Sequence, residues 1–276
     1  AHCVHCDMWK TRAREDSPTE EQWKSLLTRL RNWLGPVHVL ITGGEALMRA
    51  YTVDLVAHAS SLGLWVELLT HGCWEDQTKI ERVALARPGR VTISLDGIGE
   101  VHDTVRGRGR FFERTSRSIE TLQRMRREHG LNYQIRLKNV IMHHNLSDTV
   151  KVARFATQPG MHVFYQPIEQ NYNTAEDERW FERSQNWPAD PEEAIRVVRE
   201  LMELKRQGAH IENTFKQLEV MIPYFRNPDS LRVATQNHSA HEAKALCSAL
   251  TTLQVQSNGD VRACLSQPPV CLLYTS

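Results

Sequence analysis

Apolar runs of strand length alternate along this chain with longer segments of helical periodicity, and this alternation restricts the fold more than any other feature. The expected strands are Val37–Ile41, Leu64–Leu69, Arg90–Leu95, Tyr133–Ile141 and His162–Gln166. The expected helices are Glu20–Leu34, Leu47–Leu62, Gln77–Ala86, Glu113–His129 and Asp148–Thr157. This order predicts an α/β fold with a parallel sheet. The pattern fits an open doubly wound sheet and a closed or partly closed barrel equally well.

Polar motifs stand where the expected strands end. Thr42–Glu45 follows the first strand and Thr70–Gly72 the second, Ser94–Gly97 closes the third, and Asn139 lies late in the fourth. The carboxyl ends of parallel strands meet at one edge of a sheet. We therefore expect these residues to surround one cavity.

The first residues of the chain carry a possible metal site. Cys3-Val4-His5-Cys6 places two thiols on one tight loop, a spacing that suits a metal ion or an iron–sulfur cluster. Taken alone, it is equally typical of half a structural zinc site, with His2 or His5 as further ligands.

A second motif gives the first a context. Gly43 and Gly44 leave the backbone bare after the first strand, and Glu45 adds a carboxylate, so a small polar ligand can approach closely. In this order the two motifs resemble those of the radical S-adenosylmethionine (radical SAM) enzymes. In that family a C-x3-C-x2-C loop holds a [4Fe–4S] cluster, and a Gly-Gly-Glu strand end holds the methionine amine of S-adenosylmethionine. The resemblance implies cluster ligands at Cys3 and Cys6, and cofactor contacts at Gly43, Gly44 and Glu45.

The chain departs from this family pattern at its beginning. The first cysteine of the motif would lie two residues before Ala1, so we expect an N-terminally truncated chain that supplies two of the three thiolates and is inactive as it stands. At the other end, Cys271–Ser276 matches the translation of a transposon end used in sequencing libraries. We expect these six residues to be adapter read-through, with a natural apolar tail as the alternative.

A third motif extends the resemblance. Ser94-Leu95-Asp96-Gly97 is followed by His102-Asp103 and by Arg106-Gly107, as in radical SAM enzymes that act on peptides. The resemblance implies that Ser94 and Asp96 bind ribose hydroxyls or the methionine carboxylate, that Arg106 neutralises this carboxylate, and that Asn139 faces the adenosine. The alternative is a capped helix start with surface charges. Asn145 is expected to cap the next helix.

Two further cysteines flank a predicted hairpin. Cys247 and Cys264 stand on either side of an Asn258-Gly259 turn, an arrangement similar to the opening of a SPASM or shorter twitch domain. The resemblance implies one or more auxiliary [4Fe–4S] clusters, while a disulfide or zinc site remains the alternative. The expected organisation is a radical SAM core over 1–170, a helical and loop connection shaping the substrate mouth over 171–240, and the start of the auxiliary domain over 241–270.

Composition narrows the function classes. Lys and Arg number 34 against 33 Asp and Glu, a net charge of +1, so no strong field favours nucleic acid or an anionic membrane. No apolar stretch approaches the roughly 18 residues of a membrane span. Five of the six cysteines lie near the two ends, which favours metal or redox work in a reducing compartment, and hence the cytoplasm.

The family resemblance implies a partial (β/α)6 barrel and a reaction. S-adenosylmethionine would be cleaved reductively to a 5′-deoxyadenosyl radical, which abstracts hydrogen from a peptide or protein side chain. An electron donor such as flavodoxin or ferredoxin is implied as a partner. The alternative is a twitch-type enzyme acting on a small molecule or in cofactor biosynthesis. A more remote one is a non-catalytic zinc-binding α/β protein.

Overall fold

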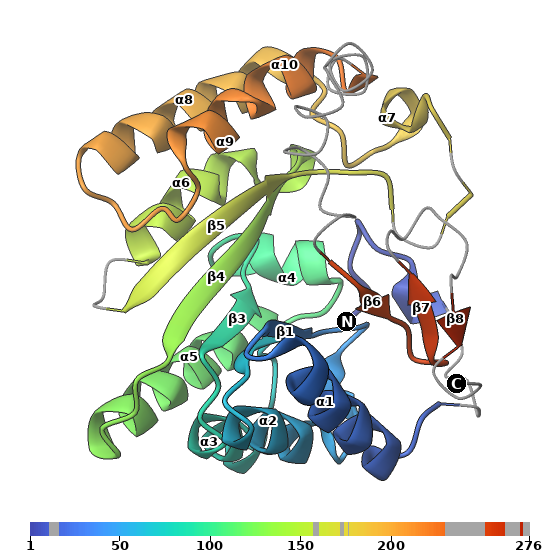
Figure 1. The fold of residues 1–276 in the computed structure, drawn as a ribbon. Helices are drawn as coiled ribbons and strands as arrows, with labels where there is room; N and C mark the ends of the chain where they lie inside the picture. Colours follow the sequence, from blue (N-terminus) through green and yellow to red (C-terminus); the bar gives the residue numbers. More distant parts are fainter. Residues whose placement is uncertain are drawn as a thin grey trace.

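Five parallel strands form the central sheet of this computed structural model, in the order β1-β2-β3-β4-β5 (Figure 1). They are β1 (His38–Ile41), β2 (Trp65–Thr70), β3 (Arg90–Ser94), β4 (Gln134–Ile141) and β5 (Met161–Pro167). The structure describes residues 1–10, 17–156, 160–171, 174–175, 177–229, 252–262 and 271–272. A doubly wound sheet reverses its strand order at a switch point, whereas this order follows the sequence throughout. The predicted α/β fold of the partial-barrel type is confirmed.

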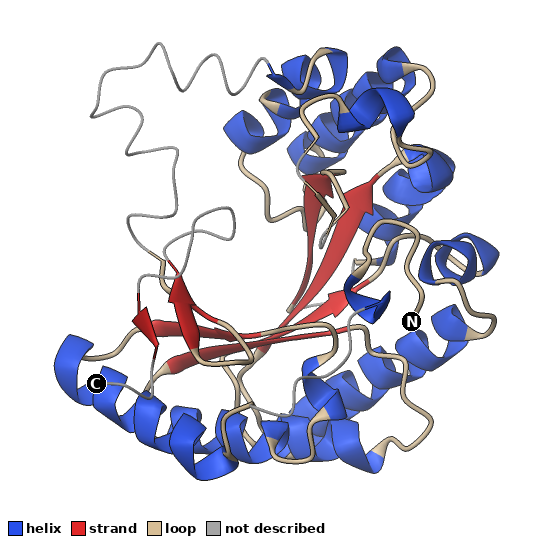
Figure 2. Cartoon of the chain, turned by 90° about the vertical axis from the view of Figure 1, so that its right-hand side faces the viewer, coloured by secondary structure: helices blue, strands red, loops and turns tan. Residues whose placement is uncertain are grey.

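Helices follow the strands and cover one face of the curved sheet (Figure 2). The α-helices are α1 (Glu20–Leu34), α2 (Thr52–Ser61), α3 (Thr78–Leu85), α4 (Glu100–Arg106), α5 (Phe111–Glu128), α6 (Leu146–Phe155), α7 (Trp180–Arg183), α8 (Pro191–Arg206), α9 (Phe215–Glu219) and α10 (Met221–Arg226). The described residues also form short 3-10 helices, namely η1 (Met8–Lys10), η2 (Ala46–Met48) and η3 (His143–Asn145). Hydrogen bonds from nearby side chains stabilise helix starts; Thr19 and Gln22, for example, form a capping box on α1.

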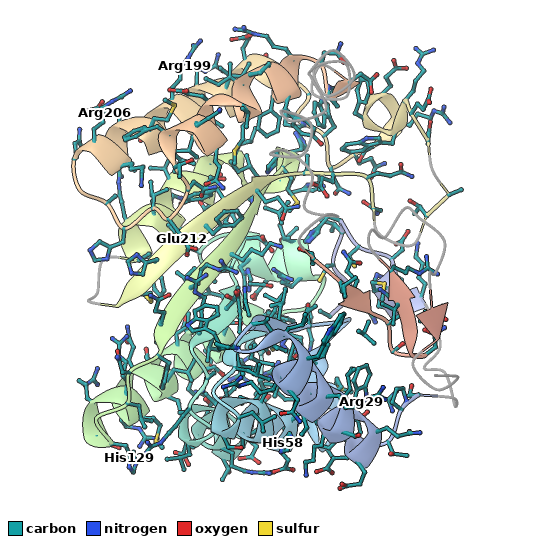
Figure 3. All side chains as sticks on the ribbon, viewed as in Figure 1. Arg29, His58, His129, Arg199, Arg206 and Glu212 are labelled. Atoms are coloured by element: carbon teal, nitrogen blue, oxygen red, sulfur yellow. The ribbon has the colours of Figure 1, made fainter. Side chains whose placement is uncertain are left out.

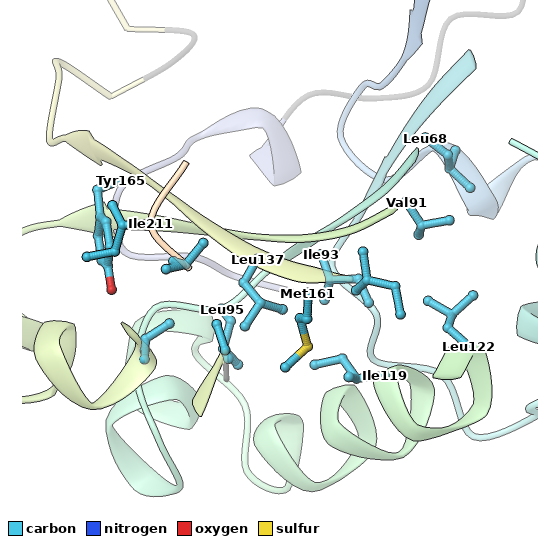
Figure 4. Packing of buried hydrophobic residues seen from close by; sticks show 14 of the residues in the cluster. Leu68, Val91, Ile93, Leu95, Ile119, Leu122, Leu137, Met161, Tyr165 and Ile211 are labelled. Atoms are coloured by element: carbon cyan, nitrogen blue, oxygen red, sulfur yellow. The ribbon is translucent and has the colours of Figure 1, made fainter. Parts of the chain in front are cut away.

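The hydrophobic core lies between the sheet and this helical layer. In Figure 4, Ile93 and Leu137 of neighbouring strands lie on the side of the sheet that faces Ile119 and Leu122 of α5. Along β4 the buried positions alternate with half-buried or exposed ones. Because successive side chains of a strand point to opposite faces, residues such as Arg136 and Lys138 lie on the face away from the helices.

A short segment takes a sixth strand position beside β5. Ile211 bridges Val163 in parallel. Next to it, the Asn213 carboxamide accepts from the Tyr165 backbone N–H (2.7 Å) and donates to the Tyr165 carbonyl (2.9 Å). The Asn213 side chain thus satisfies the backbone groups that a regular sixth strand would pair.

Charged side chains join the strands on the face opposite the helices. Glu67 of β2 is 2% exposed, accepts from Thr92 at 2.6 Å and is ion-paired with Arg136. Glu212, labelled in Figure 3 beside β4 and β5, pairs with Arg136 at 3.2 Å and with Arg90 at 3.1 Å. We call these five residues the lower network, because they lie nearer the amino ends of the strands. Two carboxylates face two guanidinium groups, so the buried charges compensate one another.

One predicted helix is interrupted. The expected helix Leu47–Leu62 divides into η2 and α2, because the Glu45 carboxylate caps the Leu47 N–H and the chain turns before α2 begins. Later in the chain α10 follows α9 after one residue, and Pro223 falls in the first turn of α10, where proline is tolerated.

The predicted hairpin is present. Strands β6 (Gln254–Val255) and β7 (Asp260–Arg262) pair antiparallel around Asn258 and Gly259, and the Gly259 φ is +85°. Strand β8 (Cys271–Leu272), in the segment expected to be adapter read-through, pairs with β7. Both Cys247 and Cys264 lie outside the described residues. Within the described ranges, no helix is long and apolar enough to cross a membrane.

Candidate functional site

The Cys3–Cys6 loop is docked against the end of α4. His2 donates its backbone N–H to the Arg106 carbonyl at 3.1 Å, and Val4 donates to the Val105 carbonyl at 3.0 Å. Helix α4 ends at Gly107, whose φ is +64°. A Cβ at Gly107 would lie 2.5 Å from the His2 carbonyl oxygen, so only glycine allows this close approach.

The opposite side of the loop is held by two asparagines from the segment after β5. The Val4 carbonyl accepts from Asn186 at 3.0 Å and from Asn171 at 3.4 Å. The cysteine loop is therefore bound on both sides by residues more than a hundred positions away. Sequence reasoning missed both asparagines, because nothing local distinguishes them from other polar loop residues.

Arg106 connects the loop to the end of β3. Its guanidinium pairs with the Asp96 carboxylate at 2.5 Å (Nη2 to Oδ2) and donates from Nη1 to the Cys3 Sγ at 3.5 Å. Asp96 is fully buried and Arg106 is 6% exposed. Burial acts to raise the pKa of Asp96, but the Arg106 guanidinium, together with smaller contributions from His5, His102 and the Val140 N–H, holds the pKa below its ordinary value. Arg106 thus remains paired with a carboxylate anion.

His5 lies inside the loop among these charges. Burial lowers the pKa of His5 to about 4, although the Asp96 charge opposes this shift. Its Nδ1 is buried and finds no hydrogen-bond partner among the described residues. His5 is therefore a neutral, half-buried side chain in the cysteine loop, with one buried ring nitrogen.

The Asp96 turn is held by side chains from α4 and from η3, which follows β4. The Asp96 N–H donates to His102 Nδ1 at 3.0 Å, and the Asp96 carbonyl accepts from Asn145 Nδ2 at 2.7 Å. Asn145 precedes α6 as expected, but its side chain forms no cap. It joins the Asp96 and Val140 carbonyls and the Met142 N–H instead. The expected capping role of its side chain is wrong, because a buried carboxamide with three backbone partners is satisfied elsewhere.

Glu45 fastens the end of β1 to the end of β2. Its carboxylate accepts from Leu47 N at 3.1 Å, from Thr70 Oγ1 at 2.8 Å and from His71 N at 2.7 Å. Burial raises the pKa of Glu45 despite these bonds. Gly43 and Gly44 remain exposed, with no atom within 4 Å of a Cβ at either position. The strand end therefore offers bare backbone, with a buried carboxylate beneath it.

Strand alternation separates Ser94 from Asn139. Ser94 is aligned with Lys138, and both lie on the face away from the helices. Asn139 is fully buried on the helical side, where its Nδ2 donates to the Leu95 carbonyl at 3.0 Å. A contact between Asn139 and an adenosine stays a prediction that this orientation does not favour.

Lys138 and Glu169 form a second charged group that sequence reasoning missed. Burial lowers the pKa of Lys138 and raises that of Glu169, and each charge partly opposes the shift of the other. Glu169 is further hydrogen-bonded to Gln166. The period-two alternation of the fourth strand could have placed Lys138 opposite the helices, but the position of Glu169 requires the fold.

A cavity of about 200 Å³ lies beside the carboxyl half of β5. Its lining is mostly apolar and includes Phe164, Gln217, Val220, Met221 and Tyr224. Strand β5, helices α9 and α10, and Val220 between the two helices contribute these residues. The cavity therefore lies at the carboxyl end of β5.

The described residues supply some of the ligands that an iron–sulfur cluster needs. Cys3 and Cys6 are free thiols on one turn, with a guanidinium at hydrogen-bond distance from one of them, and thiolates are the usual ligands of such clusters. Among the described residues, no group of three or more His, Cys, Asp or Glu side chains is placed to hold a metal ion. The two thiols can therefore supply two of the ligands of such a cluster.

Comparisons with known proteins agree with this geometry. A family model described as the radical SAM superfamily matches residues 1–156. An AdoMet-dependent heme synthase of Methanosarcina barkeri is 27% identical over 169 residues, which cover 59% of this chain and 46% of that protein. A PqqA peptide cyclase of Streptomyces rochei is 43% identical over 95 residues, which cover 34% of this chain and 26% of that protein. The chain thus spans less than half the length of these curated relatives.

A solved structure matches nearly the whole chain. Streptococcus suis SuiB bound to the precursor peptide SuiA superposes with a TM-score of 0.67, covering 99% of this chain and 61% of that chain at 13% identity. At this identity the likeness concerns the fold. The match of the family model over more than half of the sequence, together with the barrel-type sheet, establishes that this chain belongs to the radical SAM superfamily.

Proposed function

We propose that this chain is part of a radical SAM enzyme that abstracts hydrogen from a peptide or protein side chain. The observation that carries the proposal is the placement of the Cys3–Cys6 loop, which reaches the end of β3 through the bond between Arg106 and Cys3. A [4Fe–4S] cluster and S-adenosylmethionine bound there would supply a 5′-deoxyadenosyl radical. The residues of this chain bind, orient and shield these groups.

The proposed roles follow from the environment of each residue. Cys3 and Cys6 ligate the cluster, while the exposed backbone of Gly43 and Gly44 receives the methionine ammonium. Glu45 fixes this strand end through its three hydrogen bonds and supplies negative charge beneath it. Ser94 and Lys138 share the face of the sheet away from the helices and would bind ribose or carboxylate oxygens of S-adenosylmethionine. Asp96 acts by holding Arg106.

The proposed substrate class rests on two comparisons and on the cavity beside β5. The PqqA peptide cyclase match and the fold of SuiB, solved with its precursor peptide, favour a peptide. The apolar cavity beside β5 is large enough for one bulky side chain. The heme synthase match supports the second candidate, a small-molecule or cofactor-biosynthesis enzyme.

The remaining parts of the proposal come from the family. They are an auxiliary cluster at Cys247 and Cys264, a flavodoxin- or ferredoxin-type electron donor and a cytoplasmic location. The division into a core (1–170), a connection (171–240) and the start of an auxiliary domain (241–270) is proposed on the same ground.

The test uses the chain with a cysteine placed two residues before Ala1, here called the extended chain. After anaerobic reconstitution with iron and sulfide, S-adenosylmethionine and dithionite are added with one of two deuterated probes, a mixed peptide digest or an iron coproporphyrin. Deuterium in 5′-deoxyadenosine from the peptides alone supports the first candidate. Deuterium from the porphyrin alone rejects it in favour of the second.

A further inference from the structure

We propose that Arg106 is a positioning residue for the cluster, and that its hydrogen bond to Cys3 raises the reduction potential of the cluster that Cys3 ligates. This inference rests on the proposed function. It gives Arg106 a different role from the expected neutralisation of the methionine carboxylate.

Two of the three nitrogens of the Arg106 guanidinium already have partners. One terminal nitrogen pairs with Asp96 at 2.5 Å and the other donates to the Cys3 sulfur at 3.5 Å. The remaining Nε is buried and has no partner within the described part of the chain. The donor group of Arg106 is therefore turned towards the cysteine loop and the Asp96 turn.

The surroundings keep this arrangement in place. Arg106 is the last residue of α4, and its carbonyl accepts from the His2 N–H. The same residue thus holds the cysteine loop through its backbone and the Cys3 sulfur through its side chain. Asp96 is fixed in turn by the Val140 N–H at 3.0 Å. A donor that is fixed before the ligand charge develops loses little energy to reorientation.

The direction of the effect follows from charge. Reduction adds an electron to the cluster, so a nearby cation and a hydrogen bond to a ligand sulfur stabilise the reduced form. Both act strongly here because Arg106 is only 6% exposed. The paired Asp96 offsets part of the charge, but its carboxylate lies on the Nη2 side, away from the bond to Cys3.

The test is a reductive titration of the extended chain, monitored by the electron paramagnetic resonance signal that changes when S-adenosylmethionine is added. Arg106→Gln should lower the equilibrium constant for one-electron reduction about tenfold, which corresponds to a midpoint potential about 59 mV lower. Arg106→Lys keeps the charge but cannot span both partners, so its potential should fall between the two. Arg108→Gln is the matched control, since it removes a charge from an exposed residue two positions away and should change the constant less than threefold.

The outcomes separate this inference from the proposed function. If the extended chain without further substitution (the parent) shows neither this electron paramagnetic resonance signal nor 5′-deoxyadenosine, the proposed function is rejected, and the inference with it. An active parent whose potential is unchanged in Arg106→Gln, or changed no more than in Arg108→Gln, rejects the inference alone. If Arg106→Gln does not fold, Arg106→Lys decides, and a potential equal to that of the parent overturns the proposal.

Discussion

Replacing Gly107 by alanine tests whether the cysteine loop is held by its close packing against α4. Gly107 follows α4 and Gly130 follows α5, with φ angles of +64° and +59°. The residue after each glycine donates its N–H to the carbonyl five positions before it, so both glycines close a helix in the same way. Alanine at either position costs roughly 1–2 kcal/mol for its left-handed backbone. At Gly107 the new Cβ meets the His2 carbonyl oxygen at 2.5 Å, whereas nothing lies within 4 Å at Gly130. Gly130→Ala is therefore a matched control for backbone strain.

The additional cost at Gly107 can be worked from these contacts. Ordinary contact begins near 3.4 Å, so the His2 backbone must move away by about 0.9 Å. That movement strains the hydrogen bonds of His2 and Val4 to the end of α4. Two such bonds contribute about 1–3 kcal/mol together, which is roughly a 5- to 150-fold change in an equilibrium constant.

Cluster retention by the extended chain measures this cost. We expect the chelator concentration that removes half of the iron to be roughly 5- to 150-fold lower for Gly107→Ala than for Gly130→Ala. Urea unfolding followed by circular dichroism checks that both variants fold. Equal cluster retention by the two variants would show that the loop is not held at Gly107.

Three further substitutions test other parts of the account by urea unfolding. Asn145→Ala removes the side-chain partner of three backbone groups and should lower the free energy of unfolding by roughly 3–6 kcal/mol. Asn132→Ala, at an exposed position, should lower it by less than about 0.5 kcal/mol, and similar losses in the two variants would contradict the bridging role of Asn145. Glu67→Gln removes a buried charge from the lower network and should cost about 3 kcal/mol; a neutral effect would mean that the arginines do not depend on it. Burial lowers the pKa of His102 from 6.5 to about 3, so the unfolded chain binds an extra proton between these values, and stability is full above pH 6.5 and falls as the pH drops. His102→Asn, which keeps an acceptor for the Asp96 N–H, should therefore lose about 2 kcal/mol less than the parent between pH 7 and pH 5; equal losses would refute the assignment.

The sequence predicted the sheet well because its signal is local. Strand-length apolar runs and helix stop signals lie within a few residues of the groups that they govern. The observed strand β3, for example, begins at the expected Arg90 and ends one residue before the expected Leu95. The Cys3–Cys6 loop and the Gly43–Glu45 strand end were likewise readable as short motifs.

The sequence did not predict how side chains are divided between the two faces and between distant segments. Asn139 and Lys138 are adjacent, and a shift of one residue decides which of them faces the helices. Asn145 precedes a helix as a cap would, yet its partners come from two other strand ends. Asn186 contacts the Val4 carbonyl across 182 positions, and no local pattern encodes such a contact.

The central claim is that Cys3 and Cys6 bind a cluster that cleaves S-adenosylmethionine. The most direct measurement is 5′-deoxyadenosine formed by the reconstituted extended chain with S-adenosylmethionine and dithionite, beside its Cys3→Ala and Cys6→Ala variants and a Cys73→Ala control. We predict product from the extended chain and from Cys73→Ala, and none from the other two. A colourless, zinc-loaded protein without product, or product that survives the loss of Cys3 or Cys6, would contradict the account.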